Sequence, residues 1–467
     1  MENTSEKLPL PENKMGTMPE GRLLFSMAIP MVLSMLVQAL YNVVDSVFVS
    51  RISESAVTAL GLAYPVQNMQ IGFALGGAVG VNALLSKSLG EGDKEKANYA
   101  AGNGIFIMLI TMAIFMLFGV FGARPYYEMQ SEVRETVEDG TVYTAICCLL
   151  TAGLFTEIMG ERLLQASGRT VYTLFTQGTG AVLNIILDPL FIFGGLGIPA
   201  MGIAGAAVAT VIGQWVAGGL AIYFNLRKNP DVRFALRYLR PRMDSVKPIL
   251  TVGVPTIIVL MIGSVMTFGM NLILLGFPED GETAAGVFGV YYKLQSFFFM
   301  PVYGINNTTI SIIAYNYGAR KPKRIMNTVK LAVISTVSIM FVGLAVFELV
   351  PQLLIGAFNP SPAFMDIGCA ALRAITWHFP VAAVGICLGG VYQGMGVSIY
   401  STIVSLLRQL ILLLPAAYLL GLSGDINMVW WSFPISEGIS LILALAFFVR
   451  IYRRKIRPMY GPENSAR

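Results

Sequence analysis

Twelve long apolar runs constrain this chain more than any other feature of its sequence. Each run reaches the length of about 20 residues that a helix needs to cross a bilayer, and charged residues or Gly and Pro separate it from the next. Charged residues make up only 13% of the chain, about half the share that is typical of soluble domains. We therefore predict an all-α polytopic membrane protein with twelve transmembrane helices, at residues 23–50, 57–86, 98–123, 140–164, 170–194, 201–226, 248–276, 284–317, 327–355, 368–394, 400–421 and 427–450.

Lysine and arginine outside these runs lie almost entirely on one side of the predicted topology. The opposite side carries only Arg51, Arg124 and Arg134. Because loops that stay in the cytoplasm collect Lys and Arg, we expect a multi-pass protein of the inner or plasma membrane with both termini in the cytoplasm. The basic side holds the N-terminal segment, the central loop at 227–247 and the C-terminal tail.

The two halves of the chain resemble each other. After a short insertion, one constant offset of 228 residues aligns several later motifs, which favours a true repeat over unrelated helices that share Gly and Pro by chance. The matches are Ile29-Pro30 with Val254-Pro255, Gly90 with Gly318, and residues 163–172 (LLQASGRTVY) with residues 391–400 (VYQGMGVSIY).

Two parallel six-helix repeats imply a pseudo-two-fold axis along the membrane normal and a cavity between the two lobes. We predict an N-terminal six-helix lobe over residues 1–226, a cytoplasmic basic linker over residues 227–247 and a C-terminal six-helix lobe over residues 248–467.

The first apolar run carries a single carboxylate, Asp45. Gln38, Tyr41 and Asn42 lie on the same predicted helix face, at i, i+3/i+4 and i+7 spacing. An Asp at the centre of a membrane helix costs about 2.5–3.5 kcal/mol to insert, so Asp45 must face protein or water. The matching position in the second half is Met270, which has no charge.

Two further pairs of polar residues occur at i,i+4 spacing in the first half. Asn184 and Asp188 lie in the fifth run, and Glu157 and Glu161 lie in the fourth. These acids either pair with nearby arginines such as Arg162 and only set the helix register, or they form a cation or proton site. Carboxylate and amide oxygens suit a hard cation such as Na⁺, and a desolvated carboxylate readily takes up a proton.

The second half offers fewer candidates. Arg408 and Glu437 fit an interhelical ion pair. Met69 in the first half, with Phe297 and Met300 in the second, fits either a soft, adaptable pocket or plain packing.

No pattern in the sequence predicts catalysis or a bound cofactor. His378 is the only histidine, and the four cysteines lie in apolar runs without metal-ligand spacing. We expect these cysteines to be small, buried and reduced side chains. We accordingly expect no enzymatic activity, no cofactor, no structural metal and no nucleic-acid partner.

On its motifs the chain resembles the MATE (multidrug and toxic compound extrusion) family over essentially its full length. Within that family it is most similar to the bacterial branch of DinF-like and MepA-like exporters. The seventh run has no acid, which departs from the second-lobe ion site of the NorM-like branch. The resemblance rests on Ile29-Pro30, residues 38–45 with Phe48-Val49, residues 89–93, residues 165–168, residues 184–189 and the internal repeat.

The resemblance implies a monomeric secondary transporter that exports small organic compounds, often cationic and aromatic, across the lipid bilayer by antiport with H⁺ or Na⁺. In the similar branch, the residues that match Asp45, Asn184 and Asp188 form the proton or cation site, and these oxygens would hold Na⁺ if Na⁺ is the coupling ion. Glu161 resembles an acid of the drug cavity. The alternative is a flippase or exporter of lipid-linked oligosaccharide or polysaccharide in the same superfamily. The other candidates for the substrate cavity are Gln38, Tyr41, Asn42, Glu157, Met69, Phe297 and Met300.

Overall fold

The computed structural model describes residues 13–49, 54–195, 197–358 and 360–461, with the side chains at 39, 41–47, 49, 54 and 57 left out. The first half contains α1 (Lys14–Thr17), α2 (Glu20–Val49), α3 (Glu54–Gly90), α4 (Lys94–Phe121), α5 (Ala123–Glu128), α6 (Arg134–Leu149), α7 (Ala152–Ala166), α8 (Val171–Phe193) and α9 (Ile203–Lys228). A 3₁₀ turn, η1 (Leu236–Leu239), lies between the halves.

The second half contains α10 (Met243–Leu275), α11 (Gly281–Gly318), α12 (Pro322–Leu349), α13 (Pro351–Gly356), α14 (Pro362–Thr376), α15 (Phe379–Gly394), α16 (Ile399–Leu406), the π-helix η2 (Leu407–Leu412), α17 (Leu413–Gly421), α18 (Ile426–Val429), α19 (Ser432–Ile451), the π-helix η3 (Tyr452–Ile456) and the 3₁₀ turn η4 (Arg457–Tyr460). The predicted all-α fold is confirmed.

Among the described residues, ten helices are each long and apolar enough to cross a membrane. Two further pairs of helices, each bent at a short break, reach that length as a pair. The pairs are α6 with α7, bent by 45°, and α14 with α15, bent by 50°. They correspond to the fourth and tenth predicted runs, so the chain has twelve spans when each pair counts as one. The second break lies next to Pro380 in the first turn of α15, where a proline cannot donate the backbone hydrogen bond that would continue α14.

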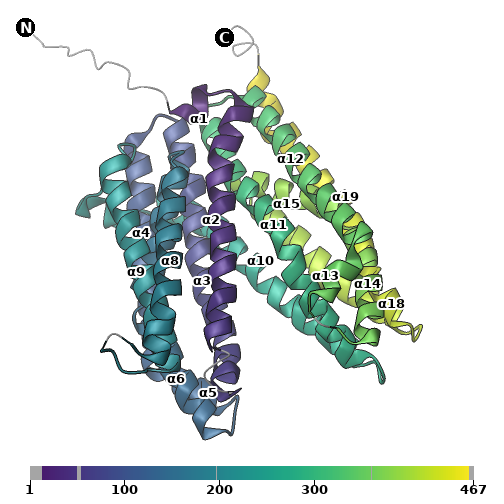
Figure 1. Cartoon of the computed structure of the whole chain (residues 1–467). Coiled ribbons are helices and arrows are strands. Elements are labelled where there is room, and N and C mark those ends of the chain that lie inside the picture. Colours follow the sequence, from purple (N-terminus) through teal and green to yellow (C-terminus); the bar gives the residue numbers. More distant parts are fainter. Residues whose placement is uncertain (1–12, 50–53, 196, 359, 462–467) are drawn as a thin grey trace, which may run out of the picture.

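The helices form two lobes that meet near α1 and diverge toward the opposite end, where α5, α6 and α18 lie (Figure 1). The lobes contact each other through the first two long helices of each: α10 packs on α3, and α11 packs on α2 and on α3. Polar side chains also join them, since Ser311 Oγ donates to Asn82 Oδ1 at 3.0 Å.

The crossing of α3 and α11 repeats the 228-residue offset of the sequence in three dimensions. A Cβ added to Gly90 would lie 1.9 Å from the carbonyl oxygen of Tyr315, and one added to Gly318 would lie 2.1 Å from that of Lys87. Tyr315 and Lys87 are themselves separated by the same offset. The two backbones therefore touch reciprocally, as a two-fold axis through this point requires, and only glycine allows the approach.

Two further glycines, deeper along α3 and α11, make a second pair of reciprocal contacts, with α10 and α2. A Cβ on Gly76 would lie 2.3 Å from the Cγ1 atom of Ile257, and one on Gly304 would lie 2.7 Å from the Cγ2 atom of Val32. Gly76 and Gly304 differ by 228 residues, whereas Val32 and Ile257 differ by 225, the offset of the Ile29-Pro30 match. The structure thus confirms two six-helix lobes related by a pseudo-two-fold axis.

The segment around α1 ties the lobes together at the end where they meet. On the side of the first lobe, the Asn13 amide donates to the carbonyl oxygen of Ser167 at 3.0 Å. On the other side, Asn316 and Arg324 donate to the carbonyl oxygen of Met15 at 3.1 and 3.2 Å. The Met15 side chain is fully buried, so α1 is part of the packed interface.

The cysteines are all free, as expected. Cys147, Cys148 and Cys387 are buried, whereas Cys369 is only half-buried.

Candidate functional site

A cavity of about 510 Å³ lies between the lobes, within the range of sites for drug-sized molecules. Its walls come from α2, α3, α7, α8 and α9 of the first lobe and from α10, α11, α15, α16 and η2 of the second. The polar lining residues of the first lobe are Ser34, Gln38, Glu157, Glu161, Arg162, Gln165, Thr173, Gln177, Asn184, Thr210 and Gln214. Those of the second are Thr256, Tyr303, Asn306, Asn307, Tyr392, Gln393, Ser401, Ser405 and Arg408.

The described carboxylates of the cavity wall both come from α7. Glu157 and Glu161 lie one helical turn apart, as their i,i+4 spacing predicts. Glu161 is 5% exposed, and each oxygen of its carboxylate accepts one hydrogen bond, at 2.6 Å from Thr176 Oγ1 and at 3.0 Å from Gln177 Nε2. Both donors belong to α8, so these bonds hold α7 and α8 together and fix the carboxylate in the wall.

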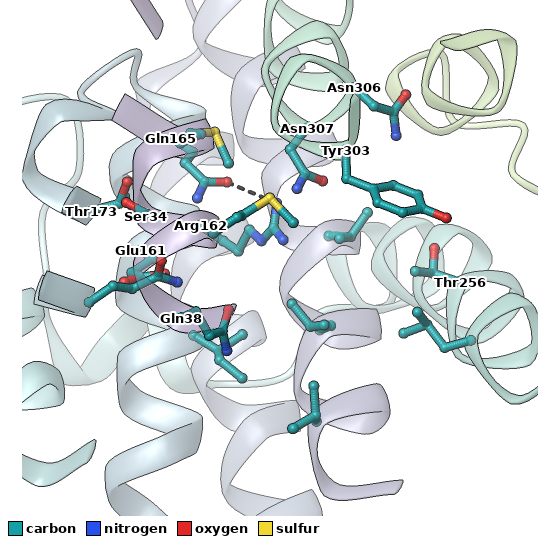
Figure 2. Close-up of a pocket in the computed structure, with 18 of the residues that line it drawn as sticks. Ser34, Gln38, Glu161, Arg162, Gln165, Thr173, Thr256, Tyr303, Asn306 and Asn307 are labelled. Atoms are coloured by element: carbon teal, nitrogen blue, oxygen red, sulfur yellow. Dashed lines mark hydrogen bonds between the residues drawn. The ribbon is translucent and has the colours of Figure 1, made fainter. Parts of the chain in front are cut away.

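Arg162 follows Glu161 in the sequence but points elsewhere. Its guanidinium donates from Nη1 to Gln165 Oε1 at 2.9 Å, and the residue is 7% exposed. Figure 2 shows the guanidinium directed toward Gln165 and away from the Glu161 carboxylate. Adjacent residues on an α-helix project about 100° apart, which explains why neighbours in sequence do not form an ion pair here.

Asn184 and Asp188 lie on one face of α8, as their spacing predicts. Asn184 Nδ2 donates to Asp188 Oδ1 at 3.2 Å and to Thr210 Oγ1 of α9 at 3.3 Å. Asp188 is fully buried, and Asn184 lines the cavity. This group of carboxylate, amide and hydroxyl oxygens is the kind of ligand set that a hard cation prefers.

The side chains of Tyr41, Asn42 and Asp45 lie outside the described residues. Their backbone belongs to α2, which packs against α8. Of the other predicted cavity residues, Gln38 lines the cavity with Glu157 and Glu161.

Three predicted pocket residues do not line this cavity. Met69 and Phe297 are 43% and 59% exposed on the protein surface, and Met300 is half-buried. Hydrophobic character alone does not show which face of a helix turns toward a cavity, since a membrane helix is apolar on the lipid side as well.

The predicted pair of Arg408 and Glu437 is confirmed, with Arg408 Nη1 3.1 Å from Glu437 Oε1. Arg408 lies in the π-helix η2 and lines the cavity. Glu437 is buried in α19 behind it. The positive charge of Arg408 is therefore largely balanced by the Glu437 carboxylate of the same lobe.

The sequence analysis did not single out three polar residues of the second lobe, one tyrosine and two asparagines. Tyr303, Asn306 and Asn307 of α11 all line the cavity (Figure 2). Their i, i+3/i+4 spacing inside an apolar run matches the spacing of the polar residues in the first run. This pattern could have identified them as one polar helix face. The Asn306 Oδ1 atom is buried without a hydrogen-bond partner among the described residues.

The MatE family model matches the chain twice, over residues 30–190 and 255–419. The Multidrug export protein MepA of Staphylococcus saprophyticus is 25% identical over 427 residues, which cover 91% of this chain and 92% of that protein. The Probable multidrug resistance protein NorM of Thermotoga maritima is 24% identical over 408 residues, which cover 85% of each chain.

The fold is shared with solved structures. One of them is the outward-facing conformation of a multidrug resistance MATE family transporter of the MOP superfamily, which is 23% identical and superposes with a TM-score of 0.89 over 97% of this chain and 99% of that one. The family model covers each half of the chain from the proline inside its first long helix onward, Pro30 in α2 and Pro255 in α10, and spans more than half of all residues. This multi-pass membrane protein therefore belongs to the MATE family of transporters.

Proposed function

We propose that this chain exports small organic, often cationic compounds by antiport with H⁺ or Na⁺. The observation that carries the proposal is the drug-sized cavity between two symmetric lobes, with the carboxylates of Glu157 and Glu161 in its wall. Buried carboxylates attract an organic cation in a medium of low dielectric constant, where one charge counts for more than it does at an exposed surface.

The distribution of basic residues supports an orientation for this state. Lys and Arg cluster on the side of the two termini, which supports a cytoplasmic position for that side. The lobes meet on the same side, around α1 (Figure 1). The cavity then faces outward, and export requires a second state in which the lobes part on the cytoplasmic side.

The coupling ion is proposed to bind at Asp45, Asn184 and Asp188. Ion binding there removes negative charge from the cavity, which lowers the affinity for a cationic substrate and releases it outside. Pro30 lies inside α2, so the helix that carries Asp45 lacks one backbone hydrogen bond and can bend at that point.

The energy available is sufficient for such a cycle. One charge that moves through 100 mV releases about 2.3 kcal/mol, and one pH unit adds about 1.4 kcal/mol. Together they could sustain a substrate gradient of roughly a few hundredfold for each ion.

The lipid-linked sugar flippase is the weaker alternative. Recognition of a pyrophosphate would favour a basic cavity, whereas the described part of this wall carries two carboxylates, and one of the two arginines described there is paired with Glu437.

Accumulation of ethidium in inside-out membrane vesicles tests the proposal, with the pH gradient and the Na⁺ gradient imposed separately. We expect one gradient to drive accumulation by the wild-type protein and neither to drive it in Asp45→Asn. The matched control is Met270→Leu, at the position that corresponds to Asp45 in the second half. Failure of both gradients with correctly inserted wild-type protein would contradict the proposed antiport.

A further inference from the structure

The basic linker between the lobes, residues 227–247, is held firmly against the side of α4. The fully buried Asn103 side chain accepts a hydrogen bond from the Arg242 backbone N–H at 2.7 Å and donates one to the carbonyl oxygen of Tyr238 at 3.0 Å. A Cβ added to Gly102 would lie 2.3 Å from the same carbonyl oxygen. The linker is therefore a fixed part of the first lobe and not a loose connection.

This contact lies along the flank of α4 and not beyond its end. The helix begins at Lys94, so Asn103 lies about 13 Å along the axis at a rise of about 1.5 Å per residue. Gly102 and Asn103 both belong to the apolar run at residues 98–123, which we predict to lie in the membrane. The linker is thus placed at the level where a spanning helix leaves the bilayer.

The exposed face of α10 leads to the same level. In its first half, exposed apolar side chains recur at i+4 spacing on one stripe: Leu250, Val254 and Ile258. Val252 and Thr256 are buried on the opposite face, so the stripe is the face that meets lipid. Continued by three and then four residues toward the start of α10, the stripe passes the exposed Lys247 and reaches Met243.

The exposed surface of the linker combines large apolar side chains with positive charge. Leu236 is 85% exposed, Met243 is 78% exposed and Phe234 is 38% exposed. Four exposed arginines alternate with them, and no acid occurs between residues 232 and 243. These arginines are Arg233, Arg237, Arg240 and Arg242. The side chains of a segment that faced only water would not need this apolar content.

The positive charge of this surface is largely unpaired within the described residues. Glu95 of α4 lies near enough to Arg237 for their charges to interact, yet none of the four arginines forms an ion pair with a described residue. Two guanidiniums are stacked on rings, with Cζ of Arg242 3.8 Å from the ring centroid of Tyr99 and Cζ of Arg237 4.6 Å from that of Tyr238. Stacking uses the flat face of a guanidinium and leaves N–H donors on its edge, where they suit a phosphate.

We propose that the linker is a binding surface for anionic phospholipids of the cytoplasmic leaflet. The side chains of Phe234, Leu236 and Met243 enter the boundary between headgroups and acyl chains, and the four arginines contact lipid phosphates. Apolar side chains beside clustered Lys and Arg are the combination with which a segment binds the surface of an anionic bilayer. The inference uses the proposed orientation of the chain and does not depend on its export activity.

Fluorescence quenching by brominated lipids tests the inference. The full chain with Leu236→Cys carries a bimane label at that position, and the half-buried Cys369 is replaced by Ser to limit labelling elsewhere. The protein is reconstituted in phosphatidylcholine vesicles that contain a fixed fraction of either brominated phosphatidylcholine or brominated phosphatidylglycerol. The ratio of the two quenching efficiencies measures how strongly the site prefers the anionic lipid.

We expect brominated lipid to quench the label, iodide in the water to quench it weakly, and phosphatidylglycerol to be preferred by about fivefold or more, since each Lys or Arg near an anionic membrane strengthens binding about fivefold. The preference should fall at high salt, which screens these charges. A label that iodide quenches and neither brominated lipid quenches would overturn the inference, because the linker would then face water, where only a soluble partner could cover it. Equal quenching by the two lipids would also overturn it.

Paired substitutions show whether the arginines of the linker cause the preference. Arg233 and Arg240 bind α4 through their backbones, so Arg233→Gln with Arg240→Gln keeps the linker docked and should lower the preference about fivefold for each charge removed. Lysine at both positions keeps the charge and should keep most of the preference.

The matched control is Arg453→Gln with Arg454→Gln, which removes two exposed charges from η3, outside the linker. It should leave quenching at position 236 unchanged. An unchanged preference in the linker variant, or an equal loss in the control, would contradict the inference. Because the assay measures no transport, such a result would leave the proposed export function intact.

Discussion

The reciprocal glycine contact between α3 and α11 leads to a quantitative prediction about the two conformational states. Gly90→Ala and Gly318→Ala each place a Cβ against a backbone carbonyl of the other helix, at 1.9 Å and 2.1 Å. Because the obstacle in each case is backbone, no side-chain rotation relieves it. The carbonyl must retreat by about 1 Å before the contact becomes one that real Cβ atoms make.

The cost of that displacement falls only on the state in which the lobes meet at this crossing. Overpacking of a tight interface costs typically about 1–3 kcal/mol. Since 1.4 kcal/mol changes an equilibrium constant tenfold, the population with the lobes parted here should rise about 5- to 150-fold. The two substitutions are relieved by the same separation of the helices, so their effects in the double variant should be less than additive.

Chemical labelling at the interface measures this shift. Ser311 is fully buried, where it donates to Asn82 across the lobes, so Ser311→Cys reports their separation through its rate of reaction with a maleimide. The half-buried Cys369 is replaced by Ser in this background to lower the labelling of other sites.

Gly77→Ala is the control, because it makes the same chemical change on α3 with no atom within 4 Å of the new Cβ. We expect the labelling rate to rise by the factor above in Gly90→Ala and Gly318→Ala and to stay near that of the parent in Gly77→Ala. Equal rates in all three variants, with an unchanged melting temperature, would refute the argument that this crossing closes the cytoplasmic side.

Further substitutions test other parts of the structure. Glu161→Gln should weaken binding of a cationic dye more than binding of a neutral compound of similar size, and equal loss for both would favour a purely structural role in holding α7 to α8. Asp188→Asn retains an oxygen for Asn184 but loses the charge, so gradient-driven efflux should fall to background at normal expression; near wild-type efflux would remove Asp188 from the coupling site. Arg324→Ala deletes its bonds to the carbonyl oxygens of Met15 and Met18, each worth about 1.5–3 kcal/mol when the donor is charged, and should speed hydrogen exchange of the amides in α1 but not in α4. Burial, and then the charge of Arg169, lower the pKa of Lys14. Its charged form therefore opposes folding below the unfolded pKa of about 10.4, and Lys14→Met should raise the melting temperature near neutral pH, with the advantage fading as the pH rises from the lowered folded pKa to that value and absent above it.

Much of the candidate site followed from spacing, because helical periodicity places i and i+4 on one face. Asn184 and Asp188 contact each other for this reason, and Glu157 joins Glu161 in the cavity wall. Periodicity does not say which face turns toward the other lobe and which toward lipid. For this reason the spacing could not show that Met69 and Phe297 lie outside the cavity.

The sequence by itself determined the helical class, the number of spans and the repeat, because these depend on properties that are local along the chain. The length of an apolar run and the distribution of Lys and Arg between runs require no knowledge of packing. The 228-residue offset also anticipated the crossing at Gly90 and Gly318, since a repeated fold must present equivalent positions to its own symmetry axis.

The tertiary structure alone decided which polar groups meet. From sequence, Arg162 was a candidate partner for the neighbouring acids, yet its guanidinium bonds Gln165 while Glu161 bonds Thr176 and Gln177 of α8. Which acceptor a side chain reaches depends on the rotation and packing of whole helices, and these are set by contacts between segments far apart in the chain. The charge pattern of the cavity therefore emerged only when the two lobes were brought together.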